Sequence, residues 1–551
     1  MASSRASGAQ LAPQDRDYRA IEGVATGITA FIGRTLKGPV AQPLTVRSFS
    51  EFQHHFGGLW QPSTVAYAVE QFFENGGREA RIVRVVNGAR PPTLVLPAGG
   101  GTLTLIAVNP GSREYLRASV DYDGLTAAEN DRFNLVIQRV RTAGSELVED
   151  QEIYRRVSVS ADSTRFVTGV LLQSTLARVH GVVPQQRPDR SAGGPGGVSV
   201  GYTLCNPDGD DGAPLTDYDV IGASTSLTGL FALEAAPRFN LLCIPPLGRE
   251  TDVGLSTLLV AARLCRERCA LLVVDPPATW STASAALAAL RVWPFRSDSA
   301  LMYFPRIHAF DRLRGRIETF GSCGAAAGLI ARADDSRLLW AATEPEEAAL
   351  RPGLRPAVAV SDAERVRLAQ AGVNTLPSVR GAARAGVSQR TLAAGGSAAT
   401  AWRYLPARRL ALYIAASIET GTRWVLLEHN GPVTWERAQA RAEDFLHALA
   451  EQGAFAGATV ADSYFVICDA RVNGPKTLAE GKFNLLFGFA TARSGQFDTW
   501  MVTHRAGSSR VRPVSVNRSA TAAARVEWEI QTSILSVWTG NPFGVSDKPR
   551  D

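Results

Sequence analysis

The stretch FNLLCIPPL at residues 239–247 decides the fold, because it begins a regular alternation of short apolar runs and helical segments. A helical segment near 252–267 and the run ALLVVDPP at 270–277 follow it. A second helical segment near 280–291 leads to the run ALMYFPRI at 300–307. Unbroken apolar strands separated by helices are typical of a parallel sheet buried on both faces. The sequence therefore predicts a βαβαβ unit, in which proline ends each strand because it cannot continue the ladder.

The segments before this unit also have clear patterns. Residues 24–36 mix β-branched and small residues and predict a strand, and residues 80–86 alternate as another strand. Between them, apolar residues at helical spacing predict a helix over 63–74. Asn75-Gly76-Gly77 should end that helix, because glycine accepts the positive φ of a C-cap.

Two further regions differ from the βαβαβ unit. From about 91 to 199, strands such as 102–108 and 132–140 are punctuated by glycine and followed by the polar run PQQRPDRSAGGPGG, which predicts an inserted β-rich domain with a surface loop. The last third predicts an α+β domain whose helix runs from Thr434 or Trp435 to about Gln452. The strands expected there are 410–418, 422–428, 464–468, 483–491 and 497–504.

The chain of 551 residues exceeds the ~250–300 residues at which one hydrophobic core stops growing. We expect a multidomain protein of α/β and α+β class. Its expected parts are an N-terminal arm (1–20), a middle α/β domain (21–90 with 200–380), the inserted β-rich domain (91–199), a C-terminal domain (381–507) and a C-terminal extension (508–551).

Composition excludes several classes of protein. A net charge of +6 without a dense block of Lys and Arg beside aromatic residues gives no reason to expect direct nucleic-acid binding. The N-terminus lacks the apolar core of a signal peptide, and apolar stretches such as Leu410–Ile418 are about half the length of a membrane span. We expect folding in the cytoplasm, no membrane insertion, and six cysteines that stay free thiols.

Motifs for catalysis are missing from the sequence. It has no G-x-S-x-G elbow, no phosphate-binding P-loop and no G-x-G-x-x-G after a strand. Asp275 follows a parallel strand, where ligands often bind, but two prolines come after it and no partner is evident. We expect no enzyme activity, no catalytic residue and no cofactor.

Metal binding is a weak alternative at two places. NPDGDDG resembles part of a calcium loop through Asp208, Asp210 and Asp211, but Ala213 stands where the loop requires glycine. Cys265 and Cys269 lie one helical turn apart without a neighbouring histidine, whereas a structural zinc site needs four ligands. We expect no metal site.

Several segments together resemble the contractile tail sheath family of phages, tailocins and extracellular contractile injection systems. The N-terminal matches are IEGVATGITAFIGRTLKGPV (21–40), SFSEFQHHFGG (48–58) and VAYAVEQFFENGGREARIVRVV (65–86). Weaker matches are NPGSREYLRASV (109–120), DGDDGAPLTDYDVIG (208–222), LMYFPRIHAFD (301–311), GVNTLPSV (372–379) and RTLAAG (390–395). The C-terminal matches are 402–457, which begins WRYLPARRLALYIAASIETG, SYFVICD (463–469) and EGKFNLLFGFATARSGQFDTWMVTH (480–504).

This resemblance implies a structural subunit that polymerises around an inner tail tube in an extended metastable state. Contraction would then drive the tube through a target envelope. The implied partners are the chain itself, in hexameric rings or a helical polymer, the tube protein, and baseplate and tail terminator proteins. The C-terminal domain would lie inward and the insertion outward. Assembly in a host cytoplasm into a virion tail or a released particle is the implied location.

The resemblance also implies roles for individual residues. Arg437 and Arg441, one turn apart on a helix, would meet acidic groups of the tube, unless they form a solvated face paired to Glu443 or Asp444. Trp435, Ala438, Ala442, Phe445, Leu446 and Leu449 would form the core stripe of that helix. The strand from Phe497 to His504 would be an arm donated to a neighbouring subunit, with Trp500 and Val502 on one side and Met501 and Thr503 on the other. An ordinary intramolecular edge strand is the alternative.

Two departures from the family pattern leave alternatives open. Residues 1–20 lack the usual strand-forming motif, and the apolar stretch VEWEIQTSILSVW (526–538) lies beyond the usual end of the family. A specialised minor sheath isoform near the baseplate or the cap would explain both departures. Less favoured alternatives are a hydrolase-like enzyme using the 239–310 sheet and an adhesion module built on the 91–199 insertion.

Overall fold

The computed structural model divides into two compact units, Ala25–Arg408 and Met1–Val24 with Arg409–Asp551. The division falls within helix α9 (Leu405–Gly421). The expected N-terminal arm lies outside the described residues except for its last position, and our finer domain boundaries stay predictions. The structure describes residues 20–191, 201–336, 338–341, 349–376, 389–395, 401–491, 496–518 and 528–531.

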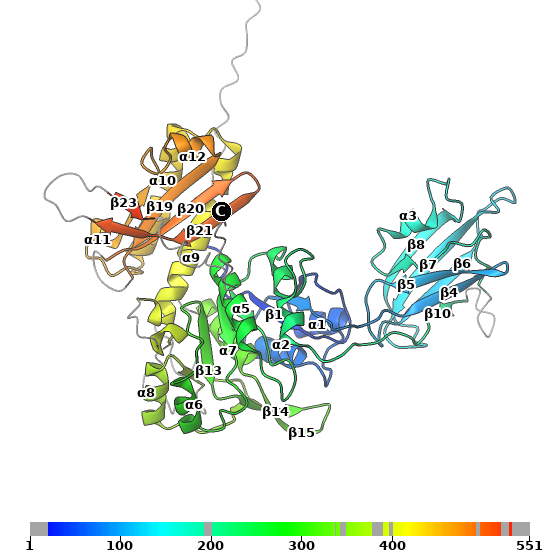
Figure 1. Cartoon of the computed structure of the whole chain (residues 1–551), viewed down its shortest axis with the longest axis horizontal. Helices are drawn as coiled ribbons and strands as arrows, with labels where there is room; N and C mark the ends of the chain where they lie inside the picture. Colours follow the sequence, from blue (N-terminus) through cyan, green and yellow to red (C-terminus); the bar gives the residue numbers. More distant parts are fainter. Residues whose placement is uncertain are drawn as a thin grey trace, which may run out of the picture. The chain divides into compact units, whose positions relative to one another are not determined.

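The larger unit is built on a seven-stranded sheet (Figure 1). Its order is β17 (Asn374–Thr375), β13 (Ala300–Phe304), β12 (Leu271–Val274), β11 (Leu241–Cys243), β1 (Thr29–Gly33), β3 (Ala80–Arg84) and β2 (Leu44–Val46). All neighbours pair in parallel except β2 with β3. The predicted βαβαβ unit is therefore confirmed, and its strands have buried side chains throughout.

Six helices of the described residues accompany this sheet. They are α1 (Phe49–Phe56), α2 (Val65–Glu74), α5 (Leu255–Glu267), α6 (Ala283–Leu290), α7 (Cys323–Ser336) and α8 (Asp362–Gln370). Helices α2, α5 and α6 were predicted from the sequence, whereas α1, α7 and α8 were not. Helix α2 ends at Asn75, and Gly76 takes the expected positive φ of 111°. Helices α2 and α7 approach closely, because a Cβ at Gly324 would lie 2.1 Å from the carbonyl oxygen of Ala68. A core of aliphatic side chains fills the space around the sheet.

The chain leaves the sheet after β3 and builds two antiparallel sheets that enclose a second hydrophobic core. One sheet has the order β10 (Thr203–Leu204), β6 (Leu116–Asp121), β7 (Arg132–Val140) and β8 (Val148–Ser158). The other has the order β4 (Thr93–Ala98), β5 (Gly101–Ala107) and β9 (Ala177–Val179), and helix α3 (Val167–Leu171) precedes β9. The strands predicted at 102–108 and 132–140 are confirmed as β5 and β7.

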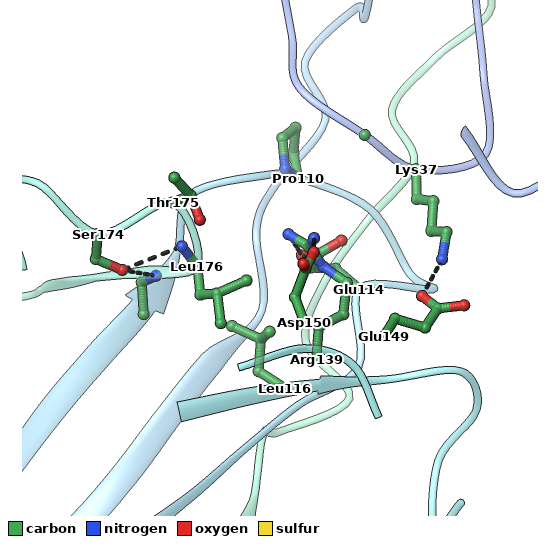
Figure 2. Close-up of polar contacts among 12 residues, drawn as sticks. Lys37, Pro110, Glu114, Leu116, Arg139, Glu149, Asp150, Ser174, Thr175 and Leu176 are labelled. Atoms are coloured by element: carbon green, nitrogen blue, oxygen red, sulfur yellow. Dashed lines mark hydrogen bonds and ion pairs between the residues drawn. The ribbon is translucent and has the colours of Figure 1, made fainter. Parts of the chain in front are cut away.

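One ion pair joins β8 to the segment after β1, and a second group of ion pairs lies within the insertion (Figure 2). Lys37 pairs with Glu149, and the side chains of both are at most one-tenth exposed. Arg139 bridges the carboxylates of Glu114 and Asp150 at 2.7 and 2.6 Å. Because unpaired buried charges are costly, these partners fix one another's positions.

The remaining elements of the larger unit are short. They are α4 (Asp217–Ile221), the 3₁₀ segments η1 (Gly229–Glu234), η2 (Leu392–Gly395) and η3 (Ala401–Arg403), and a small sheet of β15 (Arg316–Phe320), β14 (Ile307–Asp311) and β16 (Arg355–Pro356). Asp311 anchors the β14–β15 hairpin, since it accepts hydrogen bonds from the Tyr67 hydroxyl at 2.9 Å and from Arg249 at 2.7 Å.

The smaller unit packs helices against an antiparallel sheet (Figure 1). The sheet order is β18 (Tyr464–Ile467), β19 (Lys482–Phe489), β20 (Asp498–Arg505) and β21 (Ser508–Pro513). A separate hairpin pairs β22 (Ser515–Arg518) with β23 (Trp528–Gln531). The other elements are α9, η4 (Arg423–Leu427), α10 (Pro432–Glu451), α11 (Val460–Ser463) and α12 (Pro475–Ala479).

The predicted strands at 410–418 and 422–428 are wrong. The first lies within helix α9 and the second overlaps the 3₁₀ segment η4. A short apolar run does not distinguish a buried strand from a buried helix by periodicity. Here Leu410, Ile414 and Ile418 recur every fourth residue and are all buried, which is the spacing of a helix face.

Candidate assembly surface

Helix α10 carries the two arginines that were expected to face a partner. Gly431 caps the helix and Pro432 occupies its first position, where the missing N–H is no loss. One side is buried as predicted, except that Phe445 is only half-buried. The buried members of the stripe are Trp435, Ala438, Ala442, Leu446 and Leu449.

The two arginines differ in their surroundings. Arg437 is exposed, whereas Arg441 is half-buried. The Arg441 guanidinium lies over the Trp424 ring, 5.3 Å from its centroid, which is cation–π geometry. Arg437 therefore has the more accessible charge, and the position of Arg441 is partly set by an aromatic neighbour.

Hydrogen bonds attach α10 to the sheet. Trp435 Nε1 donates to Asn430 Oδ1 at 2.8 Å, and Asn430 Nδ2 donates to the Lys482 carbonyl at 2.9 Å. Gln439 Oε1 accepts from the Cys468 N–H at 3.1 Å. These hydrogen bonds hold the exposed side of the helix in a fixed position relative to the sheet.

The strand expected as a donated arm lies inside its own sheet. Strand β20 pairs with β19 on one side and with β21 on the other, so both of its backbone edges are used within this chain. Trp500 and Val502 are fully buried and Met501 is nearly so, while Thr503 and Phe497 are half-buried. The arm interpretation of Phe497 to Thr503 is therefore corrected to an intramolecular strand, and a central one instead of an edge. Strand β21 occupies the second edge of β20. It was not predicted from the sequence, because SSRVRP has few of the apolar residues that are typical of a strand.

His504 is a buried polar residue that sequence analysis did not single out. The Thr422 hydroxyl donates to the Ile418 carbonyl at 2.6 Å and lies 2.8 Å from His504 Nε2, so Nε2–H donates to Thr422. His504 Nδ1 then accepts from the Ser509 hydroxyl at 2.8 Å. Burial, with a contribution from Arg423, lowers the pKa of His504 to about 4. The neutral imidazole therefore links the end of α9 to β21.

The first described residues of the chain pack on α9. The Val24 N–H donates to Ser417 Oγ at 3.1 Å, and Ile21 is buried. A Cβ at Gly421 would lie 2.8 Å from the Ile21 side chain, so this contact requires a residue without a Cβ. The segment leading out of the expected N-terminal arm is thus held by the smaller unit.

Asp275 has a structural role in the larger unit. Its carboxylate accepts from the N–H groups of Ser322 and Cys323, the latter at 2.8 Å, at the start of α7. Burial raises its pKa. A carboxylate that accepts the first amides of a helix acts as a cap, which accounts for an acidic residue at this strand end.

The acidic loop at 208–211 is used in contacts with the insertion. Asp208 accepts from the Thr93 N–H and Asp211 from the Ser112 N–H, both at 2.8 Å, and Asp210 accepts from Gly212 at 2.7 Å. Among the described residues, no group of three or more His, Cys, Asp or Glu side chains could hold a metal ion. All six cysteines are free thiols, and five of them are buried.

Solved structures provide the comparison that matters. The sheath tail protein from Listeria innocua matches with a TM-score of 0.57 at 11% identity, over 89% of this chain and 97% of that chain. The contracted sheath complex of the extracellular contractile injection system PVC matches with a TM-score of 0.50 at 16% identity, over 90% and 97% of the two chains. This chain has the contractile-tail sheath fold. The sheath fold extends over both units, because the uncovered tenth is shorter than either unit.

Comparisons with family models and with curated proteins found no match. Within the described residues, none of the helices is long and apolar enough to cross a membrane.

Proposed function

We propose that this chain is the structural subunit of a contractile sheath. It polymerises around an inner tube in an extended metastable state and shortens to drive the tube through a target envelope. The observation that carries this proposal is the likeness to sheath proteins along about nine-tenths of the chain, one of them in a contracted state. The absence of catalytic motifs from the sequence agrees with a mechanical role.

The proposed polymer requires contacts between subunits that do not close into a two-fold symmetric dimer. Head-to-tail contacts between identical subunits generate rings or helical filaments, depending on the rotation between neighbours. Contraction then requires two packings of the subunits that differ by a modest free energy, multiplied over many copies. Baseplate and terminator proteins would set the two ends of such a polymer.

Helix α10 is the proposed face toward the tube. Arg437 projects an exposed charge from a helix that is fixed to its sheet, and Arg441 adds a second charge one turn away. Exposed charge pairs contribute about 0–1 kcal/mol each, so acidic groups of the tube would be held in the extended state yet released cheaply.

Strand addition between subunits is the proposed link along the polymer. Main-chain hydrogen bonds of an added strand persist while subunits rotate. Because β20 is paired on both sides, such a strand would have to use the outer edge of β18 or β21.

Electron microscopy of the purified chain, alone and together with a tube protein from the same source, tests the proposal. Hollow striated tubes would support it. Monomers with the chain alone but tubes or rings with a second sheath protein would favour a minor isoform. Persistent monomers under every condition would overturn the sheath function.

A further inference from the structure

The insertion is joined to the parallel sheet by two chain segments, 85–92 after β3 and 205–214 on the return. These two links bond to each other, because the N–H groups of Arg90 and Asp210 each donate to the other residue's carbonyl, at 2.9 and 2.8 Å. A domain carried on two links moves relative to its neighbour unless further contacts hold it. The contacts around the links therefore decide whether the insertion can swing.

Arg84, the last residue of β3, supplies one such contact from inside the sheet. Its Nη1 donates to the Gly38 carbonyl at 2.6 Å and its Nη2 to the Pro110 carbonyl at 2.8 Å. Gly38 belongs to the segment after β1, whereas Pro110 lies between β5 and β6 of the insertion. Arg84 is only 1% exposed, and burial lowers its pKa to about 10, which leaves the guanidinium charged at neutral pH. One buried cation thus connects the sheet to the insertion at a point outside the two links.

A second arginine holds the returning link. Arg34, directly after β1, donates through Nη2 to the carbonyls of Asp211 at 2.9 Å and Gly212 at 2.6 Å. Because β1 and β3 pair in parallel, Arg34 and Arg84 lie at the same edge of the sheet. Arg34 binds the link itself, so its bonds can persist while the insertion bends about that link, whereas the bond of Arg84 to Pro110 cannot.

The joint between the insertion and the sheet is packed backbone to backbone. Gly111 has a φ of 138° and Gly212 a φ of 75°, values that favour glycine. A Cβ on Gly212 would overlap the Asn87 carbonyl oxygen, and a Cβ on Gly209 would overlap the Gly111 carbonyl oxygen. The links and the turn that carries Pro110 therefore touch without side chains between them.

The ion pair of Lys37 with Glu149 lies next to these contacts along the chain (Figure 2). Lys37 directly precedes Gly38, so the short segment after β1 is tied to the insertion twice, once through Arg84 and once through β8. A joint with two bonded links, two arginines and this ion pair has little freedom to bend.

We propose that Arg84 locks the insertion in one orientation on the parallel sheet, so that loss of its guanidinium turns the joint into a hinge. The two links stay bonded to each other in that case, but the sheet loses its hold on the Pro110 turn. The lock does not rest on the proposed function. If the chain polymerises as proposed above, the lock makes every copy present the insertion at the same angle.

Distance measurement by pulsed electron paramagnetic resonance tests the lock in the full-length chain. Spin labels are attached through a ketone-bearing amino acid at Thr102 of the insertion and at Ser256 of α5, both exposed, so that the native cysteines stay untouched. The unchanged protein should give one narrow distance distribution, and Arg84→Met should make it at least twice as wide. A wide distribution in the unchanged protein, or an equally narrow one in Arg84→Met, would overturn the proposal.

Arg81→Met is the matched control. Arg81 is a buried arginine of the same strand, and its ion-pair partner is Glu79, directly before β3. This substitution should leave the distribution between the two domains narrow. Equal widening by Arg81→Met and Arg84→Met would assign the effect to the sheet and overturn the lock. Widening by Glu149→Gln but not by Arg84→Met would make the ion pair the lock, which also overturns the proposal.

A second label pair, Ser256 with Val366 of α8, reports on the fold of the parallel-sheet domain, because both positions are exposed on its helices. Its distance should stay the same in Arg84→Met. Where Arg84→Met widens this pair too, Arg84→Lys takes its place, since lysine keeps the charge but lacks the planar fork that reaches both carbonyls. Widening of the Thr102–Ser256 distance alone in that variant supports the lock, and an unchanged narrow distance overturns it.

Discussion

The seven-stranded parallel sheet of the larger unit and the antiparallel sheet of the smaller unit end in different kinds of edge strand. The parallel sheet of the larger unit ends in strands of only two and three residues, β17 and β2, whereas the smaller sheet ends in β21, with six residues. Short edge strands offer little template for pairing with another chain. The larger unit nevertheless has a long edge strand in its insertion, β8 with eleven residues, so the difference holds between these two sheets and not between the whole units.

Buried polar groups differ in the same manner. The larger unit buries paired charges, such as Lys37 with Glu149 and Arg249 with Asp311. The smaller unit uses mostly neutral groups, such as Asn473, Thr422 and His504. The smaller unit also buries one paired charge, Glu419 with Arg423, so the difference lies in how many charges are buried.

The largest expected effect is at the junction drawn in Figure 2. Glu149→Gln leaves the buried Lys37 without its main counter-charge, so the free energy of unfolding of the larger unit should fall by about 3–5 kcal/mol. Denaturant unfolding followed by tryptophan fluorescence measures this change.

The matched control removes both charges. Lys37→Met with Glu149→Met should lose much less stability, because neither charge is then buried alone. A double variant as unstable as the single one would mean that packing of these side chains, and not their pairing, holds the junction.

A smaller effect is expected from His504. Its folded-state pKa of about 4 lies below the ordinary value of 6.5, so the unfolded chain binds more protons between these pH values. The contribution of the neutral histidine is complete above pH 6.5 and is lost as the pH falls toward 4, by up to about 3 kcal/mol for the smaller unit.

Thermal unfolding at pH 7 and pH 4.5 measures this loss. His504→Gln, which keeps polar partners for Thr422 and Ser509 but cannot titrate, should lower stability at pH 7 and flatten the dependence below pH 6.5. The same acid sensitivity in both proteins would assign it to other groups.

Glu70 should respond to pH with the opposite sign. Burial raises its pKa to about 6 from 4.5, although Arg312 pairs with it at 2.8 Å. Its folded state binds more protons, so its contribution is present below pH 4.5 and is lost as the pH rises to 6, by up to about 2 kcal/mol. Glu70→Gln should therefore raise the free energy of unfolding of the larger unit, relative to the unchanged protein, more at pH 7 than at pH 4.5. If the difference in unfolding free energy between pH 7 and pH 4.5 is the same with and without Glu70→Gln, this prediction is wrong.

The smallest effect on stability is expected at Arg437. Arg437→Ala should change the unfolding free energy by about 0–1 kcal/mol, because the side chain is exposed. Its effect should instead be seen in co-sedimentation with the tube protein, which should weaken and become less sensitive to salt. The control is Arg263→Ala, which removes an arginine from the exposed side of α5 in the larger unit. If both substitutions weaken co-sedimentation equally, α10 does not face the tube.

Sequence patterns predicted local order well where one physical cause dominated. The apolar runs that became β11, β12 and β13 were predicted as strands buried on both faces because proline and helical segments bounded them. The buried stripe of α10 followed from its spacing, and only Phe445 was less buried than expected. At 410–418 the same reasoning failed, because a run that is apolar on all sides lacks the period that separates helix from strand.

The sequence by itself determined the parallel sheet, the β-rich strands of the insertion and the resemblance to sheath proteins, because these depend on residue order and spacing. Only the tertiary structure decided how β20 is used, since pairing with β21 depends on a strand with few apolar residues folding back across a turn at Gly507. It also decided the roles of Lys37, Asp275 and His504. These roles depend on partners far away in the sequence, which only the folded chain brings within hydrogen-bonding distance.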